Sequence, residues 1–176
     1  MCGGDGPSRR LLDRQYPFPR LFGLFQYPSM AYQFCYRRRV EFSETDMAGI
    51  MHFSNFFRFM ESAESAFYRS LGFSIIHQDA GAGWPRVHAE CDYSHPLRFE
   101  QEVDIHLLVK EKRRRSIAYL FKFVTQEAGE TLIAARGSVV AVYVTRSPEG
   151  KLNSAPIPHD FDLQIESAPP EKLAQW

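Results

Sequence analysis

Asp46 is the residue of this sequence whose setting most favours catalysis. It lies in the run ETDMAG, residues 44–49, between a strand-like segment and a helix-like one. The helix is expected to begin near Asn55, so the chain can fold back and bring the carboxylate close to the helix entrance. Free N–H groups at a helix N-terminus polarise a carbonyl, and a nearby carboxylate can attack that carbonyl or activate water. Asp46 could equally cap a turn, a common role of aspartate in such a sequence.

Two segments with different periods flank this acid. Before it, apolar residues alternate along one face, interrupted by Arg38: Tyr32, Phe34, Tyr36, Val40 and Phe42. This alternation predicts a half-buried strand. After it, between about 54 and 71, apolar residues recur every three or four positions: Phe56, Met60, Ala63, Phe67 and Leu71. That spacing predicts an amphipathic helix, with Ser54 or Asn55 capping its first amides and Gly72 ending it.

Four further strand-like segments follow the helix, at residues 86–94, 102–112, 116–126 and 131–145. EAGE, residues 127–130, is expected to form the hairpin turn between the last two. The connections are too short for parallel crossovers, so the sheet should be antiparallel. The sequence therefore predicts an α+β domain in which one long helix covers an antiparallel sheet of about five strands.

The 176 residues suffice for one domain with a substantial core, since 44% of them are hydrophobic. Residues 1–29 mix glycine, proline and aromatic residues without a helix or strand period, and predict a flexible N-terminal extension. Residues 30–147 carry the domain, and the proline-rich tail 148–176 is expected to be peripheral. Because regular patterning begins at Met30, a shorter product could start there instead of at Met1.

The composition also excludes several classes of protein. The 21 basic residues equal the 21 acidic ones, which argues against a polyanionic partner such as nucleic acid. The three cysteines form neither a disulfide framework nor a zinc knuckle, and His88 and His95 lack partners at metal-ligand spacing. No segment is apolar enough to span a membrane or to serve as an export signal. We expect a cytoplasmic protein without a bound metal.

The segment around Asp46, VEFSETDMAGIMHFSNFFRFMESAESAFYRSLG, resembles the signature of hotdog-fold acyl-CoA thioesterases of the 4-hydroxybenzoyl-CoA thioesterase type. The resemblance continues in AECDYSHPLRFEQEVDI, which is similar to the strand pair of that family, and in KEKRRRSIAYLFKF. It covers residues 34–147. Several motifs occur in the same order on different elements, which makes the match more specific than any single motif.

The resemblance implies a hotdog fold, in which the sheet wraps around one long central helix. It makes Asp46 the catalytic carboxylate, acting as nucleophile or as general base toward water. The thioester carbonyl would be held by backbone amides near His52 and Phe53. The family also implies a homodimer, with active sites at the subunit interface and possibly a further pairing into tetramers. No cofactor is implied beyond the coenzyme A of the substrate.

Three other side chains near the proposed site remain open in role. Glu61 matches an acidic family position where a supporting role is expected, and Glu64 is a reserve catalytic acid because related branches carry theirs on this helix. Either glutamate could instead be a solvated helix residue. His52 could bind the substrate or titrate near neutrality, or it could be an interface histidine without a chemical role.

The sequence KEKRRRS, residues 110–116, is the one concentrated basic segment. By resemblance, Arg114, Arg115 and Ser116 would bind the nucleotide end of coenzyme A, whose phosphates favour arginine and lysine donors. A solvated hairpin end or a nucleic-acid site are the alternatives.

The combined interpretation is an acyl-CoA thioesterase that hydrolyses a small or aromatic acyl-CoA to free acid and coenzyme A. Two alternatives remain: a hotdog lyase or dehydratase that acts on an acyl-thioester without hydrolysis, and a non-catalytic acyl-CoA-binding protein. The acyl group and the pathway are not defined by these motifs.

Overall fold

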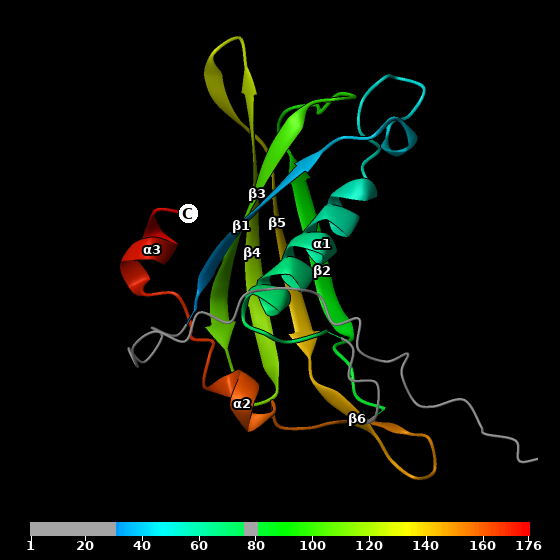
Figure 1. Ribbon diagram of the computed structural model, residues 1–176, viewed down its shortest axis with the longest axis vertical. Coiled ribbons are helices and arrows are strands. Elements are labelled where there is room, and N and C mark those ends of the chain that lie inside the picture. Colours follow the sequence, from blue (N-terminus) through cyan, green and yellow to red (C-terminus); the bar gives the residue numbers. More distant parts are fainter. Residues whose placement is uncertain (1–30, 76–80) are drawn as a thin grey trace, which may run out of the picture.

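The computed structural model describes residues 31–75 and 81–176. The extension predicted at 1–29, and Met30, lie outside these residues. The main feature is a five-stranded antiparallel sheet (Figure 1), formed by β1 (Gln33–Arg39), β2 (Arg86–Tyr93), β3 (Glu102–Lys112), β4 (Ser116–Glu127) and β5 (Glu130–Val142). The spatial order is β1-β3-β4-β5-β2, so β1 and β2 are the edge strands. The predicted antiparallel sheet of about five strands is confirmed.

Strands β3, β4 and β5 are consecutive in the sequence, and short connections pair each with the next. β3, β4 and β5 form a continuous meander, and β4 and β5 are joined by Ala128 and Gly129, whose φ angles are +51° and +84°. Two successive positive φ values match the right-handed twist of the flanking strands. The hairpin turn predicted at residues 127–130 is therefore confirmed.

The helix α1 (Asn55–Ser70) lies across one face of the sheet (Figure 1). Its predicted apolar stripe faces the sheet, and Gly72, with φ +83°, ends it as expected. Ser54 occupies the N-cap position, but its side chain makes no capping hydrogen bond, so the predicted side-chain cap is absent. The Asn55 side chain instead donates to the Glu44 carbonyl (2.7 Å), which joins the helix start to the preceding loop.

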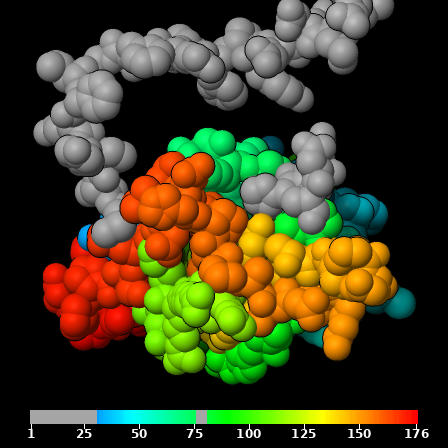
Figure 2. All heavy atoms as spheres, turned by 90° about the horizontal axis from the view of Figure 1, so that it is seen from below, coloured from blue at the N-terminus to red at the C-terminus, as the bar shows by residue number. Residues whose placement is uncertain are grey.

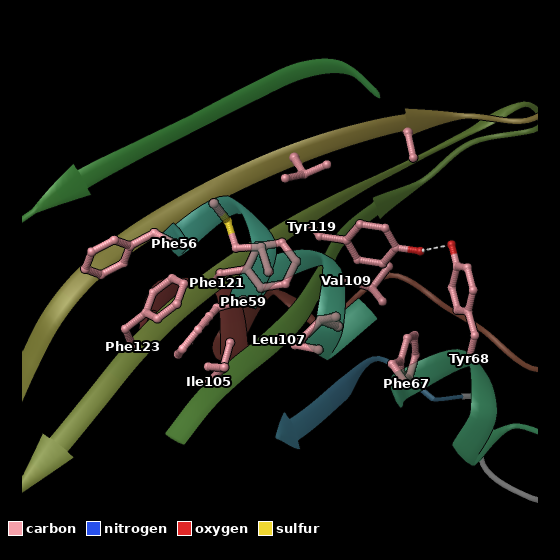
Figure 3. Close-up of a cluster of buried hydrophobic side chains, with 14 of the residues drawn as sticks. Phe56, Phe59, Phe67, Tyr68, Ile105, Leu107, Val109, Tyr119, Phe121 and Phe123 are labelled. Carbon is pink, nitrogen blue, oxygen red and sulfur yellow. Dashed lines mark hydrogen bonds between the residues drawn. The ribbon is translucent and has the colours of Figure 1, made fainter. Parts of the chain in front are cut away.

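Aromatic side chains fill the space between α1 and the sheet (Figure 3). Phe56 packs edge-on against Phe123, with ring centroids 5.1 Å apart. Gly137 of β5 lets the helix approach closely, since a Cβ there would lie 2.7 Å from the Met60 sulfur. Close approach between helix and sheet therefore depends on a missing side chain at this position.

β1 ends earlier than the alternation suggests. It stops at Arg39, and residues Phe42–Glu44 form a short 3₁₀ helix (η1) that leaves Phe42 exposed. Arg38, which interrupts the apolar face, places its guanidinium 4.0 Å from the centre of the Phe59 ring and pairs with Glu44 (2.6 Å). A cation fits this face because it has both an aromatic and a carboxylate partner.

The C-terminal tail differs most from expectation. It contains β7 (Leu152–Ser154), which pairs with β6 (Val144–Arg146), and the short helices α2 (His159–Asp162) and α3 (Pro170–Ala174). The described residues thus hold three α-helices, of which α1 alone is long. The tail passes α2 at the lower end of the molecule, and α3 then lies beside the sheet (Figure 1 and Figure 2). Phe161 is buried and packs edge-on against Tyr68, 4.8 Å away, so the tail is not merely peripheral.

None of the helices among residues 31–75 and 81–176 is long and apolar enough to cross a membrane.

Candidate active site

Asp46 lies in a tight turn at the entrance of α1. Its backbone N–H donates to the Ile50 carbonyl (2.9 Å) and its carbonyl accepts from the Gly49 N–H (2.9 Å). Gly49 has φ +72°, a conformation that glycine adopts without strain. Oδ1 accepts the Ala48 N–H (2.8 Å), so the turn-capping role is present. Oδ2 has no partner among the described residues, and the carboxylate is exposed.

Asp46 lines a cleft of about 450 Å³. The cleft is enclosed by the Asp46 turn, the entrance of α1 and the connection between β2 and β3, with Met51 N–H bonded to the Leu97 carbonyl (2.7 Å). The lining is largely apolar and aromatic apart from a few polar groups, and comprises Asp46, Ile50, Met51, Phe53, Phe56, Tyr93, Ser94, His95, Pro96 and Leu97. Such a cleft can bind an apolar group and orient its polar end.

The two backbone amides predicted to bind a carbonyl differ in availability. The His52 N–H donates to the Glu44 carbonyl (2.8 Å) and is therefore occupied. The Phe53 N–H has no acceptor within the described part of the chain. Phe53 also lines the Asp46 cleft, and its side chain is 60% exposed. Of the two amides, Phe53 is the better placed to stabilise negative charge on a carbonyl oxygen.

Glu44 holds the turn and the helix together, a role that the motif did not predict. It is 9% exposed, and its carboxylate pairs with Arg38 (2.6 Å) and accepts the Glu41 N–H (2.9 Å). Its carbonyl accepts hydrogen bonds from His52 and Asn55. A buried acid with this many partners fixes the segment that precedes Asp46.

The two histidines near the helix entrance differ in whether they line the Asp46 cleft. His52 shares a hydrogen bond with Ser54 through Nδ1 (2.8 Å), packs on Phe53 and is not among the residues that line the cleft. His95 does line it, with Nε2 paired to Glu127 (2.6 Å). His95 is distant in sequence from Asp46, so only the fold brings the two to one cleft.

Glu61 and Glu64 face a second cleft, of about 380 Å³, beside the middle of α1. Glu61 is exposed, whereas Glu64 is 1% exposed and hydrogen-bonded by Tyr68 (3.1 Å) and by Arg86. The alternative of a solvated helix residue is thus wrong for Glu64. Burial raises the pKa of Glu64 to about 6, although the Arg86 charge opposes this change.

The basic segment lies far from Asp46 within one chain (Figure 1). Arg114 and Arg115 are exposed at the hairpin that joins β3 to β4, and Arg115 donates to Ser154 (3.1 Å). The Asp46 turn lies at the other end of β3, where Ile50 pairs with Arg98. An eleven-residue strand separates the two regions by roughly 35 Å. Ser116 begins β4 and is partly buried.

Within the described ranges, no cluster of three or more histidine, cysteine, aspartate or glutamate side chains is arranged to hold a metal ion.

Comparison with known proteins gives consistent matches. Residues 40–173 match the family described as "Thioesterase-like superfamily". A putative esterase of Aquifex aeolicus (strain VF5) is 39% identical over 89 residues, which cover 50% of this chain and 70% of that protein. The 4-hydroxybenzoyl-CoA thioesterase of Pseudomonas sp. (strain CBS-3) is 23% identical over 75% of this chain and 96% of its own length.

A solved structure of a gentisyl-coenzyme A thioesterase superposes with a TM-score of 0.64 at 29% identity, covering 74% of this chain and 98% of that one. The matches span both the sheet and α1, and they confirm the resemblance to hotdog thioesterases. The chain belongs to the thioesterase-like superfamily and has its hotdog fold.

Proposed function

We propose that this chain hydrolyses an acyl-CoA thioester to the free acid and coenzyme A, with Asp46 as its catalytic carboxylate and without a metal or other cofactor. The observation that carries the proposal is the presence, in one cleft, of the exposed Asp46 carboxylate and the Phe53 N–H. Among the described residues, one oxygen of that carboxylate has no donor and the Phe53 N–H has no acceptor. The first supplies an attacking or proton-accepting group, and the second can stabilise the oxyanion.

Two reaction courses are compatible with this geometry. As nucleophile, Asp46 adds to the thioester carbonyl, coenzyme A leaves as its thiolate, and water hydrolyses the resulting anhydride. As general base, Asp46 takes a proton from water while the water oxygen adds to the carbonyl. A single turnover in ¹⁸O-labelled water, followed by mass spectrometry of the peptide that contains Asp46, distinguishes them. The general-base course leaves Asp46 unlabelled; the nucleophilic course labels its carboxylate when water attacks there.

The coenzyme A part of the site is proposed to come from a second copy of the chain. Arg114, Arg115 and Ser116 are candidates to bind the coenzyme A phosphates, yet they lie roughly 35 Å from the Asp46 turn of the same chain. A homodimer that brings one hairpin beside the partner's Asp46 turn would complete the site. The helices would then be enclosed by the joined sheets, and such dimers could pair further into tetramers.

The edge strand β2 supports this dimer. It pairs with β5 on one side only, and it carries the exposed apolar side chains of Val87 (63%) and Tyr93 (48%). An unpaired edge with apolar side chains favours pairing with another strand. Sedimentation velocity of the full chain should give a dimer or a dimer of dimers, and replacing Val87 by lysine should shift it toward the monomer. A monomeric wild type that is nonetheless active would contradict the two-copy site.

An aromatic or other small apolar acyl group suits the lining of the Asp46 cleft, where Phe53, Phe56 and Tyr93 are present. The relatives named for 4-hydroxybenzoyl-CoA and gentisyl-coenzyme A support the same class. A panel of short, long, branched and aromatic acyl-CoAs, assayed for thiol release, tests the proposal. Thiol release from at least one member is expected.

The same panel separates the alternatives. A lyase or dehydratase would transform the acyl group without releasing thiol, and a binding protein would retain coenzyme A ligands without any turnover. A dehydratase that pairs an acid with a histidine would have to use His95 with Asp46, because His95 lines the cleft and His52 does not. Absence of thiol release across the panel would overturn the hydrolase proposal.

A further inference from the structure

His95 and Glu127 form a hydrogen-bonded pair at the edge of the Asp46 cleft. Nε2 of His95 lies 2.6 Å from Oε2 of Glu127. His95 lines the cleft, whereas Glu127 does not. The ring nitrogen that the cleft can use is therefore Nδ1, which has no hydrogen-bond partner among the described residues. The two reaction courses open to Asp46 leave this pair without a role.

The fold holds His95 and Asp46 against the same cleft. The His95 N–H donates to the Ala134 carbonyl of β5 (3.0 Å). Two residues further on, the Leu97 carbonyl accepts the N–H of Met51, which directly follows the Asp46 turn (2.7 Å). The cleft has a volume of about 450 Å³, the size of a small-molecule site. Groups on its two sides can therefore act on one bound thioester.

Glu127 determines which form of the imidazole the cleft meets. A carboxylate only accepts hydrogen bonds, so the proton of the neutral ring is held on Nε2, and Nδ1 is left as a bare acceptor. A histidine whose tautomer is fixed by a carboxylate is the arrangement with which serine hydrolases remove a proton from a nucleophile. The His95 side chain is 31% exposed, so water reaches the ring. This water is the nucleophile that a thioesterase needs.

We propose that His95, positioned by Glu127, is the general base that activates the hydrolytic water, and that Asp46 acts as the nucleophile. This inference rests on the proposed thioesterase function and selects one of its two courses. Histidine is better suited than a carboxylate to general-base work near neutral pH. Oδ2 of Asp46 has no donor among the described residues, so it is available to attack.

The reaction then takes place in two steps. In the first, Oδ2 of Asp46 bonds to the thioester carbonyl carbon, the carbon–sulfur bond breaks, and coenzyme A leaves as its thiolate. In the second, the oxygen of water bonds to a carbonyl carbon of the anhydride, the bond to the bridging oxygen breaks, and one water proton passes to Nδ1 of His95. The second water proton stays on the carboxyl group that gained the oxygen and is lost to solvent. The imidazolium gives its proton to the thiolate, which restores the base.

The main variant is His95→Gln, which removes the base of the second step and leaves the first step intact. The full chain is mixed with the best acyl-CoA of the panel, and thiol release is followed before the steady state. The second step should slow roughly 10²–10⁴-fold. The variant should then release one thiol per active site in a burst, followed by a slower steady state. Mass spectrometry after rapid acid quenching should find the acyl group on the peptide that contains Asp46.

The control is His88→Gln. His88 is an exposed histidine of β2 that is likewise paired with a glutamate, Glu90 (3.3 Å), but it does not line the cleft. Its variant should keep the wild-type time course. The Kd of an S-alkyl-CoA thioether, which cannot be hydrolysed, should be the same in His95→Gln as in the wild type, because the cleft is intact. An unchanged kcat in His95→Gln would overturn the inference, and so would a lower kcat without the burst and the acylated peptide.

Glu127→Gln tests the positioning role with a substitution at the surface. A glutamine amide can donate to Nε2 as well as accept from it, so the tautomer is no longer fixed. The second step should slow roughly tenfold, while the rate of the burst is unchanged. The control is Glu130→Gln, because Glu130 is paired with Glu127 across the hairpin, is exposed and does not line the cleft. It should keep wild-type kinetics.

The double variant His95→Gln/Glu127→Gln gives a readout that a merely structural role would not produce. Because Glu127 acts through His95, the double variant should be no slower in the second step than His95→Gln alone. Losses that multiply would contradict the positioning role, as would a wild-type second step in Glu127→Gln.

This inference and the thioesterase function fail in different ways. A wild type that releases no thiol from any member of the panel refutes the thioesterase function. A wild type that releases thiol while His95→Gln is equally active refutes this inference alone.

Discussion

The buried Glu64 carboxylate should make the stability of this protein decrease as pH rises through the weakly acidic range. Its pKa is raised from an ordinary value of 4.5 to about 6, chiefly because burial removes the carboxylate from water. The folded state therefore binds the proton more tightly than the unfolded state. Below about pH 4.5 both states are protonated, and above about pH 6 both are ionised, so the effect is confined to the interval between.

The magnitude follows from the pKa difference. A change from 4.5 to about 6 corresponds to ~2 kcal/mol of unfolding free energy, at about 1.4 kcal/mol for each pH unit. Glu64→Gln removes the titration but keeps the shape of the side chain. The quantity to follow is therefore the free energy of unfolding of the wild type minus that of Glu64→Gln, because other titrating groups cancel in this difference.

Guanidinium chloride unfolding between pH 4 and pH 7.5 measures both proteins. The difference should fall by ~2 kcal/mol between about pH 4.5 and pH 6, then remain constant. A rise over the same interval would mean that the attraction of Arg86 outweighs the loss of hydration. A difference in unfolding free energy that does not change with pH would mean that the Glu64 carboxylate is not buried as described. Either result would refute the reasoning.

Three further substitutions test the packing and the proposed coenzyme A contacts. Gly137→Ala should lower the free energy of unfolding in guanidinium chloride by about 1–3 kcal/mol, because the added Cβ would meet Met60. Gly83→Ala is the control and should be nearly neutral, since no atom lies within 4 Å of its added Cβ. Equal effects of the two substitutions would contradict the close approach of α1 to the sheet. Phe161→Ala should lower stability by about 3–5 kcal/mol in the same assay, and a loss well below 1 kcal/mol would mean that the tail is peripheral after all. Arg114→Gln/Arg115→Gln should raise KM roughly tenfold with kcat unchanged, and the difference should shrink at high salt; an unaltered KM would exclude these residues from coenzyme A binding.

The regular elements were predictable because their signals are local. Apolar spacing along α1 reports which side faces the sheet, and the alternation in β3 reports which side is solvated. The turn at residues 127–130 was visible from Gly129 between two strand patterns, although Ala128 takes a positive φ that alanine seldom adopts. Each of these features depends only on residues that lie close together in the sequence.

The polar groups were not predictable in the same way. Glu64 and Arg86 are 22 residues apart and each looks like a solvated charge in its own element, so only the fold shows that they neutralise one another. His95 reaches the Asp46 cleft through the same kind of distant contact. Phe161 follows a proline-rich stretch without any period, and its burial depends on contacts with Tyr68 and Trp84 that the tail's own sequence does not encode.

The central claim is that the Asp46 carboxylate acts on a thioester carbonyl. Its most direct test is the kcat of Asp46→Asn with the best acyl-CoA of the panel, measured together with the Kd of an S-alkyl-CoA thioether. The control is Asp160→Asn, which removes an exposed carboxylate of α2. We expect Asp46→Asn to lose roughly 10²–10⁴-fold in kcat with Kd and unfolding unchanged, while Asp160→Asn keeps wild-type activity. Full activity in a correctly folded Asp46→Asn variant would contradict the account.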